Sequence, residues 1–94
     1  MAQVEVHGGD LSGGRIHQLR VQMHRLPART IDRATAIAWM KDGHSLVPVL
    51  AGERAPALQL VEVGEPAEWF IRADNQPTTE DALPALPSVA SAGR

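Results

Sequence analysis

The four histidines are the only metal ligands of the imidazole or thiolate type in this chain of 94 residues, because cysteine is absent. A zinc site needs several converging ligands, usually at short spacings, and no pair of these histidines has such a spacing. His17 and His24 lie an odd number of residues apart, so they would share a face on a helix but not on a strand. We therefore expect no bound metal and no cofactor.

His44 and Ser45, close to Asp42, are the nearest approach to a hydrolytic constellation. Adjacent residues on a strand point to opposite faces, so His44 cannot easily activate the Ser45 hydroxyl. The sequence also contains no Gly-x-Ser-x-Gly elbow. We expect a protein that is not an enzyme.

Arg72, Asp74 and Asp81 form the most informative polar cluster, around the point where the last expected strand ends. In the structural interpretation, Arg72 pairs with Asp74 or Asp81 and holds the C-terminal segment in place. In the functional interpretation, the Arg72 guanidinium binds an anionic group of a partner through two parallel hydrogen bonds.

Trp69 is the candidate anchor for a partner protein. It is followed directly by Phe70, and neighbouring strand residues face opposite ways, so one of the two rings lies on the less buried face. Exposed aromatic side chains are frequent anchors in protein interfaces. Trp69, Arg72 and Asp74 are therefore the candidate partner-binding residues.

A basic segment, residues 15–33, is the strongest indication of nucleic-acid binding. Residues 11–41 carry a balance of +5 and residues 42–94 a balance of −5. An arginine-bearing ribbon can enter a major groove, although the pI of about 6.0 is far from that of a typical nucleic-acid binder. The alternative is a solvated face whose charges protect an edge strand. The candidate nucleic-acid residues are Arg15, Arg20, His24, Arg25 and Arg29.

The first half of the chain predicts two strands. Residues 2–7 alternate around Val4 and Val6, and two glycine pairs follow in a wide turn. Residues 15–25 fit a strand by alternation and a helix by the spacing of their apolar residues. Because Gly13 and Gly14 would begin that helix, we favour the strand. Residues 26–30 are expected to be a connection.

The second half predicts one short helix and three strands. Asp32 is placed to cap the helix and Gly43 to end it. Strands over 45–51, 57–63 and 68–73 are separated by short Gly/Pro turns, which is typical of an antiparallel meander. Pro48 places the first of them at a sheet edge, or indicates a bulge there. The expected fold is a small α+β domain of order β-β-α-β-β-β, with a mostly antiparallel sheet covered by one helix.

The C-terminal part is expected to leave the sheet after residue 73. Thr78 or Thr79 can cap a single helical turn over residues 80–82, and the Leu-Pro pairs beyond it cannot continue a helix. We expect one domain over residues 1–87 and a disordered tail over residues 88–94, which are small and polar.

The stretch from residue 32 to 87 resembles a family of small bacterial domains of unknown function. The family pattern is a capped short helix ending in glycine, three short strands, an aromatic-Ile-Arg strand, a Pro-containing loop and a final Leu-Pro. Ala73 and Ala82 depart from it, where threonine and asparagine are usual. The matching residues are Asp32, Ile37, Met40, Gly43, Phe70-Ile71-Arg72, Asp74-Asn75-Gln76-Pro77, Asp81, Leu83 and Leu86-Pro87. The resemblance implies a fold and a bacterial origin, and no chemistry.

Together these observations favour a non-enzymatic protein-interaction module, self-associating through a sheet edge. The alternative is a nucleic-acid-binding or transcription-modulating protein that uses residues 15–33. No apolar run approaches the ~20 residues that span a bilayer, and the absence of cysteine is typical of a reducing compartment. We expect a cytoplasmic protein with no membrane partner.

Overall fold

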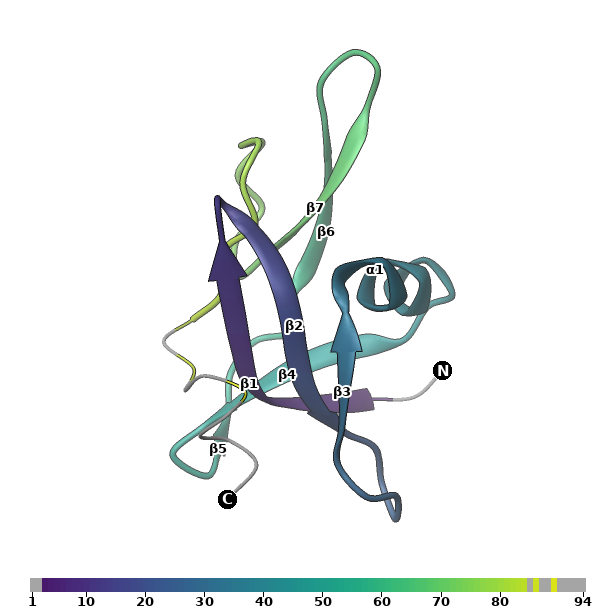
Figure 1. Ribbon diagram of the computed structural model, residues 1–94, viewed down its shortest axis with the longest axis vertical. Coiled ribbons are helices and arrows are strands. Elements are labelled where there is room, and N and C mark those ends of the chain that lie inside the picture. The colour runs from purple at the N-terminus through teal and green to yellow at the C-terminus, as the bar shows by residue number, and fades with distance from the viewer. Residues whose placement is uncertain (1–2, 85, 87–88, 90–94) are drawn as a thin grey trace.

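The computed structural model describes residues 3–84, 86 and 89, which form an α+β domain (Figure 1). Its elements follow the order β-β-β-α-β-β-β, with a five-stranded sheet and a two-stranded sheet. The fold class and the mostly antiparallel pairing are confirmed. Within the described residues, no helix is both long and apolar enough to cross a membrane.

The N-terminal hairpin consists of β1 (Gln3–Ser12) and β2 (Arg15–Gln22), paired antiparallel. Gly13 and Gly14 both have positive φ in the turn between them, a conformation that glycine adopts without steric cost. Residues 15–22 are a strand, so the strand interpretation of this segment is confirmed. Two irregularities in the register bend the long β1 strand.

An additional strand, β3 (Arg29–Asp32), begins within the segment predicted as a connection and pairs antiparallel with β2. The helix α1 (Arg33–Lys41) begins immediately after it. The Asp32 carboxylate accepts from the Thr35 backbone N–H at 2.8 Å, and Gly43 has a φ of 96° beyond the last turn. The predicted cap and end of the helix are both confirmed. Ala36 buries fully on the inner face.

The predicted three-stranded meander is confirmed for its last two strands, which pair antiparallel, and is wrong for the strand that begins at Ser45. The strand β4 (Ser45–Leu50) lies parallel to β1 and also pairs with the short β5 (Glu53–Arg54), giving the order β3-β2-β1-β4-β5. Pro48 is therefore inside the sheet and almost fully buried, rather than at an edge. It is the last residue of β4 that pairs with β1, so its missing N–H removes little from the ladder.

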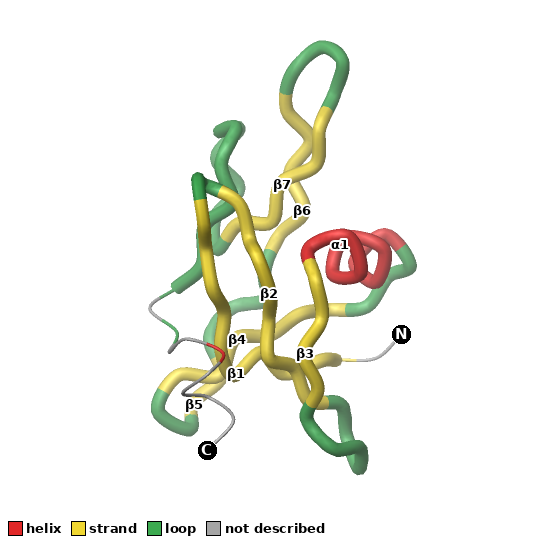
Figure 2. The backbone as a smooth tube through the Cα atoms, in the orientation of Figure 1, coloured by secondary structure: helices red, strands yellow, loops and turns green. Residues whose placement is uncertain are grey.

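The last two strands, β6 (Gln59–Val63) and β7 (Glu68–Arg72), form a separate antiparallel hairpin. Figure 2 shows this hairpin leaving the body of the domain, with its loop at the far end. At its base, the Leu58 N–H donates to the Leu46 carbonyl oxygen at 2.8 Å, which joins the hairpin to β4.

The core lies between the five-stranded sheet, α1 and the hairpin base. Leu83 and Leu86 pack against it, so the C-terminal segment folds back over the domain. Residues 80–82 do not form the predicted helical turn. The turn does not form because the Asp81 side chain is buried in the core. The predicted tail, residues 88–94, lies outside the described residues except for Val89. The core residues are Val4, Val6, Ile16, Leu19, Val21, Ile31, Ala36, Leu46, Leu58 and Ile71.

Candidate functional site

The outer edge of β6 is a candidate binding feature, because part of its backbone points away from β7. In an antiparallel pair, residues opposite each other either exchange backbone hydrogen bonds or both direct their backbone groups outward. The Ile71 N–H donates to Asp81 Oδ1 at 3.0 Å, and its carbonyl oxygen accepts from the Ala82 N–H at 2.9 Å. Ile71 therefore points away from β6. Because Leu60 is opposite Ile71, the backbone groups of Leu60 point away from β7.

The same reasoning places Glu62 on that outer edge. The carbonyl oxygen of Trp69 accepts from the Arg33 guanidinium, outside the hairpin, and Trp69 is opposite Glu62. Leu58 lies two residues before Leu60, so its N–H also points outward, and this N–H donates to β4. Among the described residues, no hydrogen bond reaches the outward backbone groups of Leu60 and Glu62. We call these groups the β6 edge.

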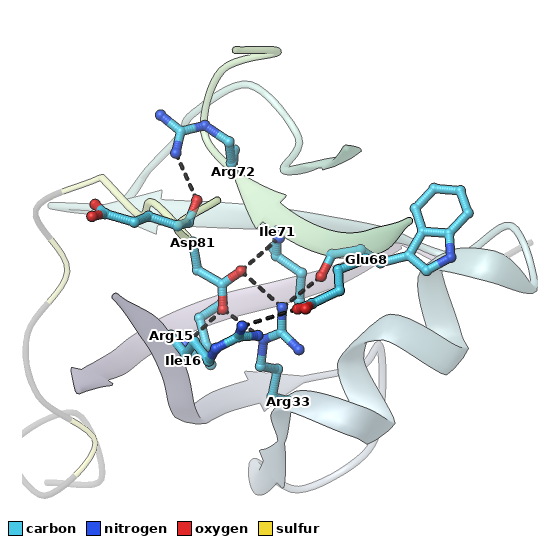
Figure 3. A network of polar contacts seen from close by, with 9 residues as sticks. Arg15, Ile16, Arg33, Glu68, Ile71, Arg72 and Asp81 are labelled. Carbon is cyan, nitrogen blue, oxygen red and sulfur yellow. Dashed lines mark hydrogen bonds and ion pairs between the residues drawn. The ribbon is translucent and has the colours of Figure 1, made fainter. Parts of the chain in front are cut away.

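A buried carboxylate fixes the hairpin that carries this edge (Figure 3). The Asp81 side chain is fully shielded from solvent and accepts from the backbone N–H groups of Ile16, at 2.7 Å, and of Ile71, at 3.0 Å. Arg33 donates from Nε to the same carboxylate at 2.7 Å. One side chain thus joins β2, β7 and the first turn of α1.

The electrostatics of Asp81 favour its ionised form. Burial alone raises the pKa of this carboxyl, but the hydrogen bonds from Arg33, Ile16 and Ile71 outweigh it and lower the pKa below the ordinary value. A carboxylate whose acceptor sites are filled by protein donors has none left for a substrate. Asp81 therefore positions the hairpin.

Arg72 has the partner that one of the two structural alternatives predicted. Its Nε lies 2.6 Å from Asp74 Oδ1, and its guanidinium also donates to the Glu80 carbonyl oxygen at 2.6 Å. The hydrogen bond with Asp74 raises the pKa of Arg72, and the same bond lowers the pKa of Asp74. Arg72 pairs with Asp74 and not with Asp81, because Asp81 turns inward to Arg33.

Trp69 is half-buried and Phe70 almost fully buried, so the two rings do lie on opposite faces with unequal exposure. The Lys41 ammonium stands 4.9 Å from the Trp69 ring centroid. Arg72 is on the other face of β7, three residues along the strand. The structure therefore does not bring Trp69 together with Arg72 and Asp74.

Phe70 is covered by two arginines. The Arg15 and Arg33 guanidinium carbons stand 5.2 and 5.5 Å from its ring centroid, and Arg15 also pairs with Glu68 at 2.9 Å. Arg15, a candidate nucleic-acid residue, is thereby engaged with the hairpin. The positive charge of Arg15 is offset by the negative charge of Glu68.

The other basic candidates are dispersed. Arg20 is half-buried on β2, with its Nε lacking a partner in the described residues. Arg29 stacks 5.6 Å from the Trp39 ring centroid. His24 and Arg25 are exposed beyond the end of β2, where they line a surface cavity. The structure brings His24 and Arg25 together, and it separates them from Arg15 by the length of the strand.

Sequence reasoning missed Arg33, Leu60 and Glu62. From the sequence, Arg33 was interpreted only as part of the basic segment. Its position directly after the Asp32 cap places it at the start of the helix, and in the structure its side chain reaches the hairpin. The β6 edge has no local signal, because it depends on which neighbours β7 already has. In the described part of the chain, no cluster of three or more His, Cys, Asp or Glu residues could hold a metal ion.

Comparison with known proteins adds no identity. No family model, no curated protein and no solved structure matches this chain. The resemblance over residues 32–87 thus stays a prediction from its motifs.

Proposed function

We propose that this protein is a protein-interaction module that takes up a strand of its partner along the β6 edge. The observation that carries the proposal is the open backbone of Leu60 and Glu62, on a strand whose other side is fully paired with β7. An extended segment can add to such an edge through main-chain hydrogen bonds, while its alternating side chains confer selectivity. Pro, Lys and bulges, which commonly block edges, are absent from residues 59–63.

A second copy of the chain is the partner whose fit the register supports. Two β6 strands can pair antiparallel about Val61, so that Leu60 of each copy lies opposite Glu62 of the other. The outward groups of these residues then form four hydrogen bonds, and no like charges stand opposite each other. This arrangement has the two-fold symmetry that most homodimers have.

The size of the edge limits its affinity. Two strands of five residues bury far less than the ~1,200 Å² of a stable protein–protein interface. We therefore propose a transient dimer, in which the two hairpins form one four-stranded sheet. The half-buried Trp69 is on β7, opposite Glu62, so β6 lies between the Trp69 backbone and the new strand.

Sedimentation velocity over a range of protein concentrations tests this proposal, with two substitutions at one position. Glu62→Pro removes an outward N–H without breaking the β6–β7 ladder, and Glu62→Thr retains that N–H. We expect the native chain and Glu62→Thr to dimerise with rising concentration, and Glu62→Pro to stay monomeric. Equal dimerisation of Glu62→Pro would place the interface elsewhere. A native chain that stays monomeric throughout would contradict self-association by this edge.

Nucleic-acid binding is the second candidate function, favoured by the outward face of β2. Gln18, Arg20 and Gln22 alternate with the buried Leu19 and Val21, so the three polar side chains share one face. Anisotropy of labelled duplex and single-stranded DNA at low and physiological salt tests it, with Arg20→Ala and Arg25→Ala as variants. Binding that weakens steeply with salt supports this function, and no binding at low salt rejects it. For either function we propose a cytoplasmic location, since the sequence has no cysteine.

A further inference from the structure

A polar cavity of about 210 Å³ lies beyond the end of β2, away from the β6 edge. It is formed where the start of β1, the end of β2 with its following loop, and β5 meet. Figure 1 shows the loop after β2 at the opposite end of the molecule from the tip of the β6–β7 hairpin. The polar residues that line the cavity are Gln3, Glu5, Gln22, His24, Arg25 and Arg54.

The single carboxylate of this cavity is already neutralised. Glu5 lies 3.0 Å from His7 Nε2 and 2.9 Å from the Arg54 guanidinium. Arg54 also donates to the Gln3 side-chain oxygen at 2.7 Å. Arg25, in contrast, has neither an ion pair nor a hydrogen bond to its side chain among the described residues. The cavity wall therefore carries one uncompensated guanidinium charge.

The backbone conformation of Arg25 is one in which an arginine is unexpected. Its φ is 63°, in the left-handed region that glycine and asparagine adopt far more readily than arginine. The turn around it is closed by a 3.1 Å bond from the Leu26 N–H to the Met23 carbonyl oxygen. Glycine would make this turn with less strain, so the turn itself gives no reason for an arginine. An unfavourable backbone that holds an unpaired cation over a cavity points to a ligand.

We propose that this cavity binds a small oxyanion, with a phosphate group as the preferred ligand. The Arg25 guanidinium matches a phosphate through two parallel hydrogen bonds, and His24 and the Gln22 amide supply further donors at the rim. A metal cation is disfavoured there, because the only carboxylate is held by two basic side chains. The proposal is independent of strand addition at the β6 edge.

Titration with inorganic phosphate, followed by amide chemical shifts, tests the site against chloride at equal ionic strength. Arg25→Gly removes the guanidinium and relieves the backbone strain, so this variant folds at least as well as the native chain. Ala51→Gly is the matched control, because Ala51 is the other non-glycine residue with positive φ in the described part of the chain, at 51°, and it does not line the cavity. It relieves similar strain and leaves the binding groups in place.

We expect saturable shifts at residues 22–25 with phosphate, weakened about tenfold or more by Arg25→Gly and unchanged by Ala51→Gly. No saturation, or equal shifts with chloride, would overturn the proposal, as would unchanged binding by Arg25→Gly. A labelled oligonucleotide then identifies the source of the phosphate. An oligonucleotide that phosphate displaces assigns the cavity to a nucleic-acid backbone, and one that does not bind assigns it to a free small anion.

Discussion

Replacing Asp81 by asparagine tests how the hairpin is held to the sheet. The substitution keeps the size of the side chain but removes its charge. It leaves the Arg33 guanidinium, which is 22% exposed, without its anionic partner. It also turns an NH₂ group toward donors, since Ile16, Ile71 and Arg33 all donate to this carboxylate. We expect a strongly destabilised protein.

The magnitude follows from the burial of the pair. Removing one partner of a buried, hydrogen-bonded ion pair costs about 3–5 kcal/mol. A chain of this length has a free energy of unfolding of roughly 5–14 kcal/mol. Asp81→Asn therefore removes roughly a fifth or more of the stability of a typical domain of this size, and more than half when that stability is at the lower end of the range. Asp74→Ala is the matched control, because Asp74 also pairs with an arginine but is exposed, and exposed ion pairs contribute little to stability.

Urea denaturation at neutral pH measures both variants. We expect a much lower midpoint for Asp81→Asn and nearly the native midpoint for Asp74→Ala, with unchanged slopes. If Asp81→Asn lost no more stability than Asp74→Ala, the carboxylate would not be the link between β2, β7 and α1, and the reasoning would be refuted.

The change in the free energy of unfolding at acid pH also tests the role of Asp81. The folded pKa of Asp81 lies below its ordinary value of 3.8, because Arg33 and two backbone N–H groups outweigh its burial. The unfolded chain therefore binds more protons in that range, and the stabilisation is present above the unfolded pKa and lost as pH falls through the folded pKa. Asp81→Asn should lose less stability between neutral and acid pH than the native chain. Glu5, Asp32 and Asp74, whose pKa values are also lowered, retain part of the dependence.

Two further substitutions test local parts of the fold. Asp32→Ala removes the carboxylate that accepts from Thr35 and should lower the midpoint of urea denaturation, whereas Asp32→Asn, which keeps an acceptor oxygen, should stay close to the native midpoint. Gly9→Ala places a Cβ 2.7 Å from the Leu83 side chain and 3.0 Å from that of Leu19. We expect it to displace the C-terminal segment and to cost roughly 1–3 kcal/mol, with faster proteolysis after residue 83; unchanged proteolysis would show that Leu83 moves aside freely.

Local chemistry was sufficient to predict the helix and most strands. Asp32 and Gly43 define the ends of α1 through a side-chain cap and a left-handed glycine, both of which are local effects. The alternation of Leu19 and Val21 with polar neighbours identified β2 in the same way. The four-residue strand β3 was missed because only Ile31 in it is buried, which gives too little alternation to detect.

Pairing between distant strands could not be predicted from local patterns. The short turns suggested that β4 pairs with β6, but β4 instead lies parallel to β1, across a connection that contains β3 and α1. The candidate site also depends on contacts between segments that are distant in the sequence. Trp69, Arg72 and Asp74 were found as residue types, yet the β6 edge exists because Asp81 and Ala82 already occupy the outer side of β7. Only the folded arrangement shows which strand remains open.

Hydrogen exchange at single amides tests the open edge most directly. The Leu60 and Glu62 N–H groups point away from β7, whereas the intervening Val61 N–H pairs with it, so the three neighbours form an internal comparison. At low protein concentration we expect fast exchange at Leu60 and Glu62 and slow exchange at Val61. At high concentration, strand pairing between two copies should slow Leu60 and Glu62 and leave Val61 unchanged. Exchange at Leu60 and Glu62 that is fast at every concentration, or as slow as at Val61 in the monomer, would contradict the proposed role of this edge.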